Sequence, residues 1–444
     1  MIKIPYYAEK IITILEENGF EAYIVGGCVR DSLLDMSPSD YDITTSATPE
    51  EMKAVLSDYK IIETGISHGT LTVLSQGNPL EITTFRCDGE YTDHRRPDSV
   101  TMTRNLREDL ARRDFTVNAM AYSEKNGLID LYNGKNDLDN RVIRCVGDAS
   151  RRFEEDALRI MRALRFAATL GFSIEAETSR QIYEKAHLLS YVSAERIATE
   201  FCRLICGKNA ADIILSYREV FALIIPELEK TFDLDQNNHH HIYDVFTHTV
   251  KVVEATPPIL PVRLAALFHD IAKPLVMTYD ENGIGHFYGH PDLSAEIAET
   301  VMKRLKLPTA LIREVCDLVR LHDVRPAPNK KSIRKYLSKN PNVNTDHIMA
   351  IRRADLSAQN PEYHHQFDML LETENIIREI KEEGLCISLR QLEVNGNDIA
   401  SLGAKGQLIG VILNKLLADV CEEKLQNEKN ALMRRAKQLF SSLK

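Results

Sequence analysis

The chain has 444 residues, 44% of them apolar and 27% charged, with a formal net charge of −10. These values suit a soluble globular protein of two to four domains, and no apolar run is long enough to cross a bilayer. The N-terminus lacks the apolar core of a signal peptide and the eight cysteines form no metal-type pairs, so we expect a cytoplasmic protein with no membrane partner. Seven arginines cluster between Arg86 and Arg113, so the acidic balance does not exclude a nucleic-acid partner.

The first candidate site follows an apolar run, Ala22–Val25, which predicts a buried strand. Asp40 and Asp42 come shortly afterwards, and residues i and i+2 of a strand point to one face. Two like charges this close repel unless a cation lies between them, and Mg²⁺ takes carboxylate oxygens while leaving positions for phosphate. Two such ions can activate a hydroxyl and stabilise a leaving pyrophosphate. Alone, such a pair in a polar loop is usually a turn or capping feature.

Phosphate-binding candidates accompany these carboxylates. Gly26 and Gly27 directly follow the predicted strand, and paired glycines let backbone N–H groups approach a triphosphate closely. Arg30 could neutralise that triphosphate, and Arg113, in a later basic run, could contact phosphate or ribose. By themselves, a Gly-Gly pair is usually only a turn and an Arg-Arg-Asp run is usually a solvated ion pair.

A β-hairpin is expected around Gly77-Asn78. Glu81, on its second strand, is a candidate third carboxylate for the site, although an outward residue on a half-buried strand explains it as well. Residues 88–98 are polar and lack apolar periodicity, so they predict a flexible loop.

The stretch 151–170 predicts a packed helix with one polar side. Arg159, Arg162 and Arg165 share that broad side, and Asp156 lies near its start. A solvated charged face is the default explanation of such a pattern. An aspartate can also accept from the exocyclic amine of cytosine or adenine, and arginine donates to ring acceptors, so this side is a candidate for base recognition.

Candidate metal ligands occur in a fixed order in the second half of the chain: His248, then His269-Asp270, then Asp355. Imidazole and carboxylate together suit a divalent transition metal, and an adjacent His-Asp pair can bridge two ions. A lone helical histidine is more often a core residue, but the complete series favours metal binding. Further ligands could come from His286, His290 and His322.

Several motifs together carry a family resemblance: G-G-x-V-R-D with D-x-D, R-R-D-F-T-x-N-A, and E-D-x-x-R. With them the chain resembles the class II tRNA nucleotidyltransferase/poly(A) polymerase family, in its bacterial CCA-adding branch, and the H…HD…D series resembles the HD phosphohydrolases. The resemblance implies template-independent addition of CCA to the tRNA 3′ end from CTP and ATP, with Mg²⁺ at Asp40 and Asp42. It implies triphosphate contacts from Gly27, Arg30 and Arg113. It implies base recognition by Asp156 and Arg159, with Arg162 and Arg165 at further arginine positions of the family.

The resemblance also implies an α+β fold, in which an α/β head with a mixed sheet precedes an all-helical neck, body and tail. The expected boundaries are 1–140 for the head, 141–225 for the neck with the base-recognition motif, 226–375 for the HD-type body and 376–444 for the tail. The tail is the part expected to contact tRNA.

The sequence leaves other functions open. Within the same family, the chain could add only CC or only A, which depends mainly on the loop at 88–98, or it could be a poly(A) polymerase. It could instead be chiefly an HD phosphohydrolase with a degenerate head, or a non-catalytic RNA-binding protein. The oligomeric state, the identity of the second metal and any catalysis at that site are also open.

Overall fold

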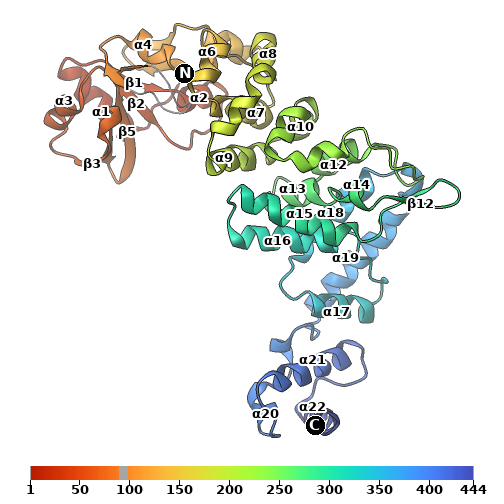
Figure 1. Cartoon of the computed structure of the whole chain (residues 1–444). Coiled ribbons are helices and arrows are strands. Elements are labelled where there is room, and N and C mark those ends of the chain that lie inside the picture. Colours follow the sequence, from red (N-terminus) through yellow and green to blue (C-terminus); the bar gives the residue numbers. More distant parts are fainter. Residues whose placement is uncertain (1, 90–98, 444) are drawn as a thin grey trace. The chain divides into compact units, whose positions relative to one another are not determined.

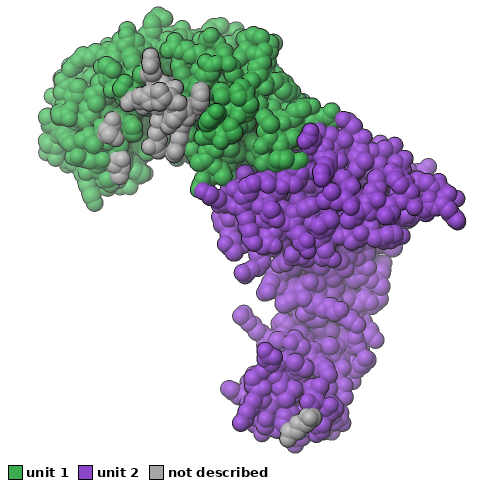
Figure 2. Space-filling view, viewed as in Figure 1, with its two compact units in different colours: residues 1–226 green, residues 227–444 purple. Residues whose placement is uncertain are grey.

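The computed structural model describes residues 2–89 and 99–443. The chain forms two compact units, residues 1–226 and 227–444 (Figures 1 and 2). Most of the loop predicted at 88–98 lies outside the described residues. The short strands on either side of the gap, β6 (Arg86–Asp88) and β7 (Val100–Met102), pair with each other in antiparallel fashion.

The first unit contains a seven-stranded mixed sheet with strand order β3-β4-β5-β2-β1-β8-β9. β2 and β5 are parallel, and all other neighbours are antiparallel. β1 is buried along its whole length, which confirms the prediction from its apolar run. The strands are β1 (Ala22–Val25), β2 (Asp42–Thr45), β3 (Lys60–Gly65), β4 (Thr70–Ser75), β5 (Asn78–Thr84), β8 (Met120–Ser123) and β9 (Gly127–Asp130).

β4 and β5 form the expected hairpin, but its turn lies one residue earlier than predicted. The turn consists of Gln76 and Gly77, with φ values of 52° and 80°. Positive φ at both central residues matches the twist of paired strands, and this geometry fixes the register of the hairpin. As a result, Glu81 of β5 lies opposite Asp42 of β2.

The α-helices of the first unit are α1 (Tyr6–Glu17), α2 (Gly27–Leu33), α3 (Pro49–Val55), α4 (Leu106–Ala111), α5 (Gly134–Asp139), α6 (Ala149–Glu155), α7 (Leu158–Leu170), α8 (Ala176–Lys185), α9 (Ala194–Ile205), α10 (Ala210–Ser216) and α11 (Arg218–Ile224). A small parallel pair, β10 (Val142–Ile143) and β11 (Ser173–Ile174), interrupts the region predicted to be all-helical. The physical reason is Gly171, whose φ of 69° ends α7 and lets the chain return beside β10.

The second unit is helical apart from the short antiparallel pair β12 (Thr278–Tyr279) and β13 (Gly285–His286). Five of its helices pack together around the predicted metal ligands (Figure 1): α12 (Val245–Ala255), α13 (Leu260–Phe268), α15 (His290–Arg304), α16 (Thr309–Leu321) and α18 (Thr345–Ser357). The others are α14 (Lys273–Val276), α17 (Lys330–Lys339), α19 (Gln366–Glu382), α20 (Gly396–Ala400), α21 (Gln407–Cys421) and α22 (Lys429–Ser442). Across residues 2–89 and 99–443, no helix combines the length and apolar character of a membrane span.

Candidate active site and metal centre

Three carboxylates meet where β1, β2 and β5 lie side by side. Asp42 is the first residue of β2, and Glu81 faces it on β5. Asp40 lies two residues before the strand begins, so the expectation that both aspartates belong to one strand is wrong for Asp40. Chain pairing with β1 starts only at Asp42, opposite Val25, which leaves Asp40 in the preceding loop.

The charges of this carboxylate group act on one another. Asp42 as a whole residue is exposed, but the surrounding protein partly desolvates its carboxyl. This desolvation is the largest cause that raises the pKa of Asp42, to about 6, and the charges of Asp40 and Glu81 raise it as well. Arg113 opposes the rise without cancelling it. Concentrated negative charge of this kind is relieved by a cation, and an all-oxygen donor set suits a hard divalent ion.

The glycine pair brings an arginine close to this group. Gly26 has a φ of 80°, a conformation that favours glycine, and a Cβ built on it would lie only 3.1 Å from Arg113 Nη1. Arg30 is buried; its Nη1 donates to Asn118 Oδ1 at 2.7 Å, and its Nη2 lies 2.7 Å from Asp31 Oδ1. The structure therefore holds Arg30 inside the protein, whereas Arg113 lies beside the carboxylates.

Asp109 is a buried part of the site that sequence reasoning missed. Its side chain accepts from Arg112 Nη2 at 2.8 Å, from Thr44 Oγ1 at 3.2 Å and from Arg113 Nη2 at 3.4 Å. Burial by itself raises the pKa of Asp109, but the two arginines outweigh it and the pKa is lowered. Asp109 thus fixes Arg113 against β2. The i, i+3 and i+4 spacing of one acid and two arginines was the available signal.

The predicted helix over 151–170 is wrong as a single element, because the chain breaks at Asp156. α6 ends at Glu155, and Asp156 has extended backbone angles, with φ −138° and ψ 102°. Its Oδ1 accepts from Leu158 N at 3.1 Å, which starts α7, and its Oδ2 lies 2.9 Å from Arg196 Nη2 on α9. An aspartate that caps the next helix competes with continuation of the first one.

Arg159 and Arg165 are the most deeply buried of the predicted base-recognition arginines. Arg159 Nη1 donates to Glu155 Oε2 at 2.7 Å, and Nη2 donates to the backbone oxygen of Arg112 at 2.9 Å. Arg159 thus ties α7 to the basic segment that carries Arg113. The structure places Asp156 and Arg159 within one turn of each other at the start of α7, as the motif suggested.

Arg162 and Arg165 pair with two buried acids, Asp114 and Glu200, and Arg162 Nη1 also lies 4.0 Å from Glu200 Oε1. Arg162 Nε donates to Asp114 Oδ2 at 2.8 Å, and Arg165 pairs with Glu200 of α9. Burial alone raises the pKa of Asp114, but Arg162 prevails and lowers it to about 2. Arg162 keeps 34% of its side chain exposed, so it is the arginine of this group most open to a ligand.

Phe166 organises these arginines and was also missed by sequence reasoning. The guanidinium carbons of Arg165, Arg30 and Arg162 lie 3.8, 5.0 and 5.4 Å from the centre of its ring. Phe115 packs edge-on against the same ring at 5.8 Å. Cations over an aromatic face are attracted to it, so one buried ring holds arginines from α2 and α7 together.

Replacing Asp114 with asparagine should lower the free energy of unfolding in a pH-dependent way. The folded pKa of about 2 lies below the ordinary value of 3.8, so the stabilisation is complete above about pH 4 and is lost as the pH falls towards 2. The expected loss at pH 7 is about 2 kcal/mol. Urea denaturation of the first unit, followed by circular dichroism, measures it. The exposed Asp139→Asn is the control, and a deficit that stays constant down to pH 3 contradicts the expectation.

The second unit brings together all four residues of the H…HD…D series. His248 Nε2 lies 3.1 Å from Asp355 Oδ1 and 3.6 Å from Asp270 Oδ2, and His269 Nε2 lies 3.1 Å from Asp270 Oδ2. All four residues are buried. They come from α12, the end of α13 and α18, so three separate helices supply the donors.

Two of the further histidines join this cluster and one does not. His290 Nε2 lies 3.3 Å from Asp270 Oδ1 and 3.3 Å from His322 Nε2. Asp270 is thereby shared by two groups of three candidate ligands, the second consisting of Asp270, His290 and His322. His286 lies outside these groups and contacts Asp280 at 3.3 Å instead.

The donor set fits a divalent metal. The Nε2 atoms of His248 and His269 are buried and make no hydrogen bond of acceptable geometry with any described residue, although carboxylate oxygens lie nearby. Buried polar atoms normally have partners, so converging ring nitrogens of this kind are typical of a metal site. Burial, followed by the charge of His269, lowers the pKa of His322 to about 3, which keeps that ring neutral and able to ligate.

Lys273 is a member of this centre that the sequence did not single out. Its buried Nζ lies 2.7 Å from Asp270 Oδ2 and donates to Gln236 Oε1 at 2.7 Å. A cavity of about 500 Å³ opens onto Asp270, Lys273 and His322. The centre is therefore reachable by a small molecule and carries a cation beside the carboxylates.

Comparison with known proteins assigns the class. The model of the Poly A polymerase head domain matches residues 22–144, "Probable RNA and SrmB- binding site of polymerase A" matches 171–231, and the HD domain matches 239–356. The carboxylate group and the metal centre lie within the first and third of these regions. Fold and sites together define a nucleotidyltransferase of the poly(A) polymerase type with an HD domain.

Relatives narrow this class further. The CCA-adding enzyme of Leuconostoc mesenteroides is 41% identical over 306 residues, 62% of this chain and 75% of that protein. The CCA-adding enzyme of Lactobacillus delbrueckii subsp. bulgaricus is 54% identical over 203 residues, 46% of this chain and about half, 51%, of its own length. The crystal structure of the Bacillus stearothermophilus CCA-adding enzyme in complex with CTP matches with a TM-score of 0.70 and 28% identity, covering 99% of both chains.

The chain belongs to the CCA-adding enzyme family. The family resemblance and the α+β fold class predicted from the sequence are therefore confirmed. Membership implies a divalent metal for the nucleotidyltransferase, and the His/Asp cluster of the HD domain could bind another.

Proposed function

We propose that this protein adds CCA to the 3′ end of tRNA from CTP and ATP, without a nucleic-acid template. The observation that carries the proposal is the group formed by Asp40, Asp42 and Glu81, with Arg113 beside it. In the reaction, the terminal ribose hydroxyl of tRNA attacks the α-phosphorus, the bond to the β-phosphate oxygen breaks and pyrophosphate leaves. Mg²⁺ held by Asp40 and Asp42 would supply electrophilic activation of the phosphate and of the attacking hydroxyl.

The basic residues beside this group would bind the nucleotide triphosphate. Arg113, fixed by Asp109, would neutralise the phosphates, and Gly26-Gly27 keeps that approach free of side chains. Arg30, which is held by Asp31 and Asn118, would support the binding site from behind.

Base recognition is proposed for the start of α7. Asp156 would accept from the amine shared by cytosine and adenine, and Arg159 would donate to a ring acceptor. Arg162 and Arg165 extend the arginine face around Phe166. Since Arg196 already contacts Asp156 Oδ2, it would hold that carboxylate in position for the base.

Replacing Asp156 with alanine should reduce nucleotide selectivity more than folding. Loss of a specific base contact costs about 1–3 kcal/mol, so misincorporation of UTP and GTP relative to CTP should rise about tenfold or more. Single-nucleotide incorporation on tRNA ending in C measures the ratio. Asp148→Ala is the matched control, since Asp148 also caps a helix in this region, through Ser150 N at 2.9 Å. If the Asp156→Ala variant excludes UTP and GTP as well as the wild type does, residues other than Asp156 recognise the base.

The activity itself is tested with tRNA that lacks its CCA end. The protein is incubated with Mg²⁺ and CTP, ATP or both, and the product ends are sequenced. The expected products are CC from CTP alone and CCA from both nucleotides. Long A tails from ATP alone would instead show a poly(A) polymerase, and CC or A as the only product from suitable tRNAs would show a specialist enzyme.

A second activity is favoured by the metal centre. The cluster of His248, His269, Asp270 and Asp355 would hold a divalent transition metal such as Mn²⁺, Ni²⁺ or Zn²⁺, since imidazole ligands favour these ions. We infer that this site hydrolyses phosphate monoesters or 2′,3′-cyclic phosphates at tRNA ends. Water would attack phosphorus, one ester P–O bond would break, and the released ribose oxygen would take the proton.

The four-part division remains our proposal for the organisation of the chain: head 1–140, neck 141–225, body 226–375 and tail 376–444. The tail has a hydrophobic core of its own, which includes Ile399, Ile412, Leu416 and Leu432. This core makes it a self-contained part for contact with tRNA. A cytoplasmic location is proposed as well, because all eight cysteines are free thiols and the proposed substrates are intracellular.

A further inference from the structure

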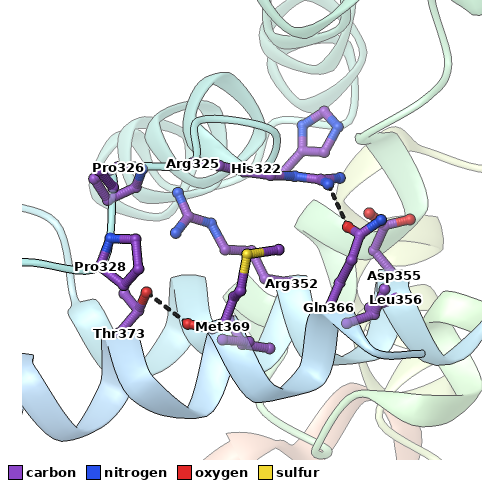
Figure 3. Close-up of a pocket in the computed structure, with 12 residues that line it drawn as sticks. His322, Arg325, Pro326, Pro328, Arg352, Asp355, Leu356, Gln366, Met369 and Thr373 are labelled. Carbon is purple, nitrogen blue, oxygen red and sulfur yellow. Dashed lines mark hydrogen bonds between the residues drawn. The ribbon is translucent and has the colours of Figure 1, made fainter. Parts of the chain in front are cut away.

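A smaller pocket adjoins the cavity of the metal centre (Figure 3). It has a volume of about 210 Å³ and lies between the segment that follows α16 and the helices α18 and α19. Its walls are largely apolar, and they include Pro326, Ala327, Pro328, Leu356, Met369 and Leu370. The pocket shares His322, Arg325, Asp355 and Gln366 with the larger cavity, so the two spaces adjoin beside the metal cluster.

One buried cation reaches into this apolar pocket. Figure 3 shows the Arg352 side chain extending from α18 between the two prolines and Met369. Arg352 is only 7% exposed, and its Nη2 donates to the backbone oxygen of Leu321 at 3.3 Å. Its guanidinium carbon lies 5.4 Å from the centre of the Tyr336 ring, and its Nε has no hydrogen-bond partner among the described residues. Buried donors without a partner are costly, so this guanidinium is suited to an acceptor supplied from outside.

The walls and the donor together select the chemistry of that ligand. Most of the wall is apolar, and both arginines that line it are already engaged, Arg325 with Gln366 and Arg352 with the backbone oxygen of Leu321, which disfavours a free phosphate as the occupant. A flat heterocycle can pack against prolines and methionine while its ring nitrogen or carbonyl accepts from arginine. The small volume suits one such ring rather than a larger molecule.

We propose that this pocket binds the nucleobase of a nucleoside phosphate whose phosphate group faces the metal cluster. The hydrogen bond from Arg325 Nη1 to Gln366 Oε1, 2.7 Å long, lies where the two spaces meet and marks the position of the ribose. The base would then distinguish nucleotide ends from simple phosphate esters. The proposed position of the phosphate rests on the phosphohydrolase function proposed above, whereas the proposed binding of the base does not.

Binding of the base is tested without metal or turnover. The full chain is labelled with ¹³C in its methionine methyl groups, and the Met369 signal is assigned by its loss in Met369→Leu. Adenosine or cytidine should shift this signal saturably. Ala327→Trp, which fills the pocket from an exposed position, and Arg352→Met should each weaken the binding about tenfold or more. Arg353→Met, on the same helix but outside the pocket, should leave it unchanged. If millimolar nucleoside does not shift the Met369 signal, the inference is wrong.

Kinetics then connect the pocket to the metal centre. With Mn²⁺, Ni²⁺ or Zn²⁺ bound, kcat/KM is measured for a nucleoside 2′,3′-cyclic phosphate, for an RNA oligonucleotide ending in the same group, and for a cyclic phosphate of ribose without a base. Ala327→Trp should lower the first two values about tenfold and leave the third unchanged. If kcat/KM is equal for base-containing and base-free substrates, the pocket does not bind the base and the inference is wrong, whereas the proposed phosphohydrolase activity is still supported. If no substrate is hydrolysed but nucleoside still shifts the Met369 signal, only the proposed phosphohydrolase activity is contradicted. A higher value for the oligonucleotide identifies RNA ends, rather than free nucleotides, as the source of the base.

Discussion

Asp42→Ala and Asp40→Ala should each abolish nucleotide addition while tRNA binding persists. The two carboxylates and Glu81 concentrate negative charge at one point; burial of its carboxyl, followed by the charges of Asp40 and Glu81, raises the pKa of Asp42 to about 6. Removing one carboxylate removes ligands for the catalytic metal, worth several kcal/mol in the transition state, so the rate should fall at least about 1000-fold. Incorporation of labelled CTP measures the rate, and filter binding measures tRNA affinity.

The exposed Asp58→Ala, in the same unit, serves as the matched control and should incorporate CTP at the normal rate. Near-normal incorporation by either test variant would remove the proposed metal site. Loss of both incorporation and tRNA binding would point to misfolding, which circular dichroism of the purified variant would reveal.

The second large effect is expected at the metal centre. Wild-type protein should carry a transition metal that is absent from the double variant His269→Ala/Asp270→Ala, and hydrolysis of cyclic phosphate should disappear with it. Addition of CCA should continue, because the proposed head site does not use these residues. Elemental analysis, a phosphate-release assay and incorporation of CTP provide the three measurements.

The double variant leaves Lys273 without its carboxylate at 2.7 Å, which could destabilise the unit. The single variant His269→Ala avoids this problem and should lose metal as well. His347→Ala is a control on α18 whose ring contacts Glu314 instead of the cluster, and it should retain metal. Wild-type protein that binds no transition metal after incubation with it contradicts the metal hypothesis. Bound metal without hydrolysis would leave a purely structural site.

Much of the candidate site could be predicted because its chemistry is concentrated in few residue types. His248 and Asp355 are distant in sequence, but the ordered H…HD…D series predicted that they share one cluster, and the fold brings His248 Nε2 within 3.1 Å of Asp355 Oδ1. Asp42 could be predicted as a site carboxylate because it opens a strand, and the fold places it at the start of β2, opposite Glu81.

The remaining features depend on contacts that no local pattern contains. The break at Asp156 depends on capping of Leu158 and on Arg196 from another helix. Asp109 resembles any acid in a charged helix until the fold places Thr44 and two arginines around it. The pair β10–β11 similarly depends on where Gly171 directs the chain after α7.

The ring of Phe166 has a consequence for engineering the enzyme. Arg30 belongs to the proposed triphosphate site and Arg162 and Arg165 to the base-recognition side, yet the guanidinium carbons of all three lie within 5.4 Å of the centre of the same aromatic ring. We therefore expect nucleotide affinity and nucleotide choice to be coupled, because a substitution at one of these arginines alters the packing of the others around the ring. Redesign of the specificity of this scaffold has to vary these positions as one combinatorial set, with Phe166 held constant.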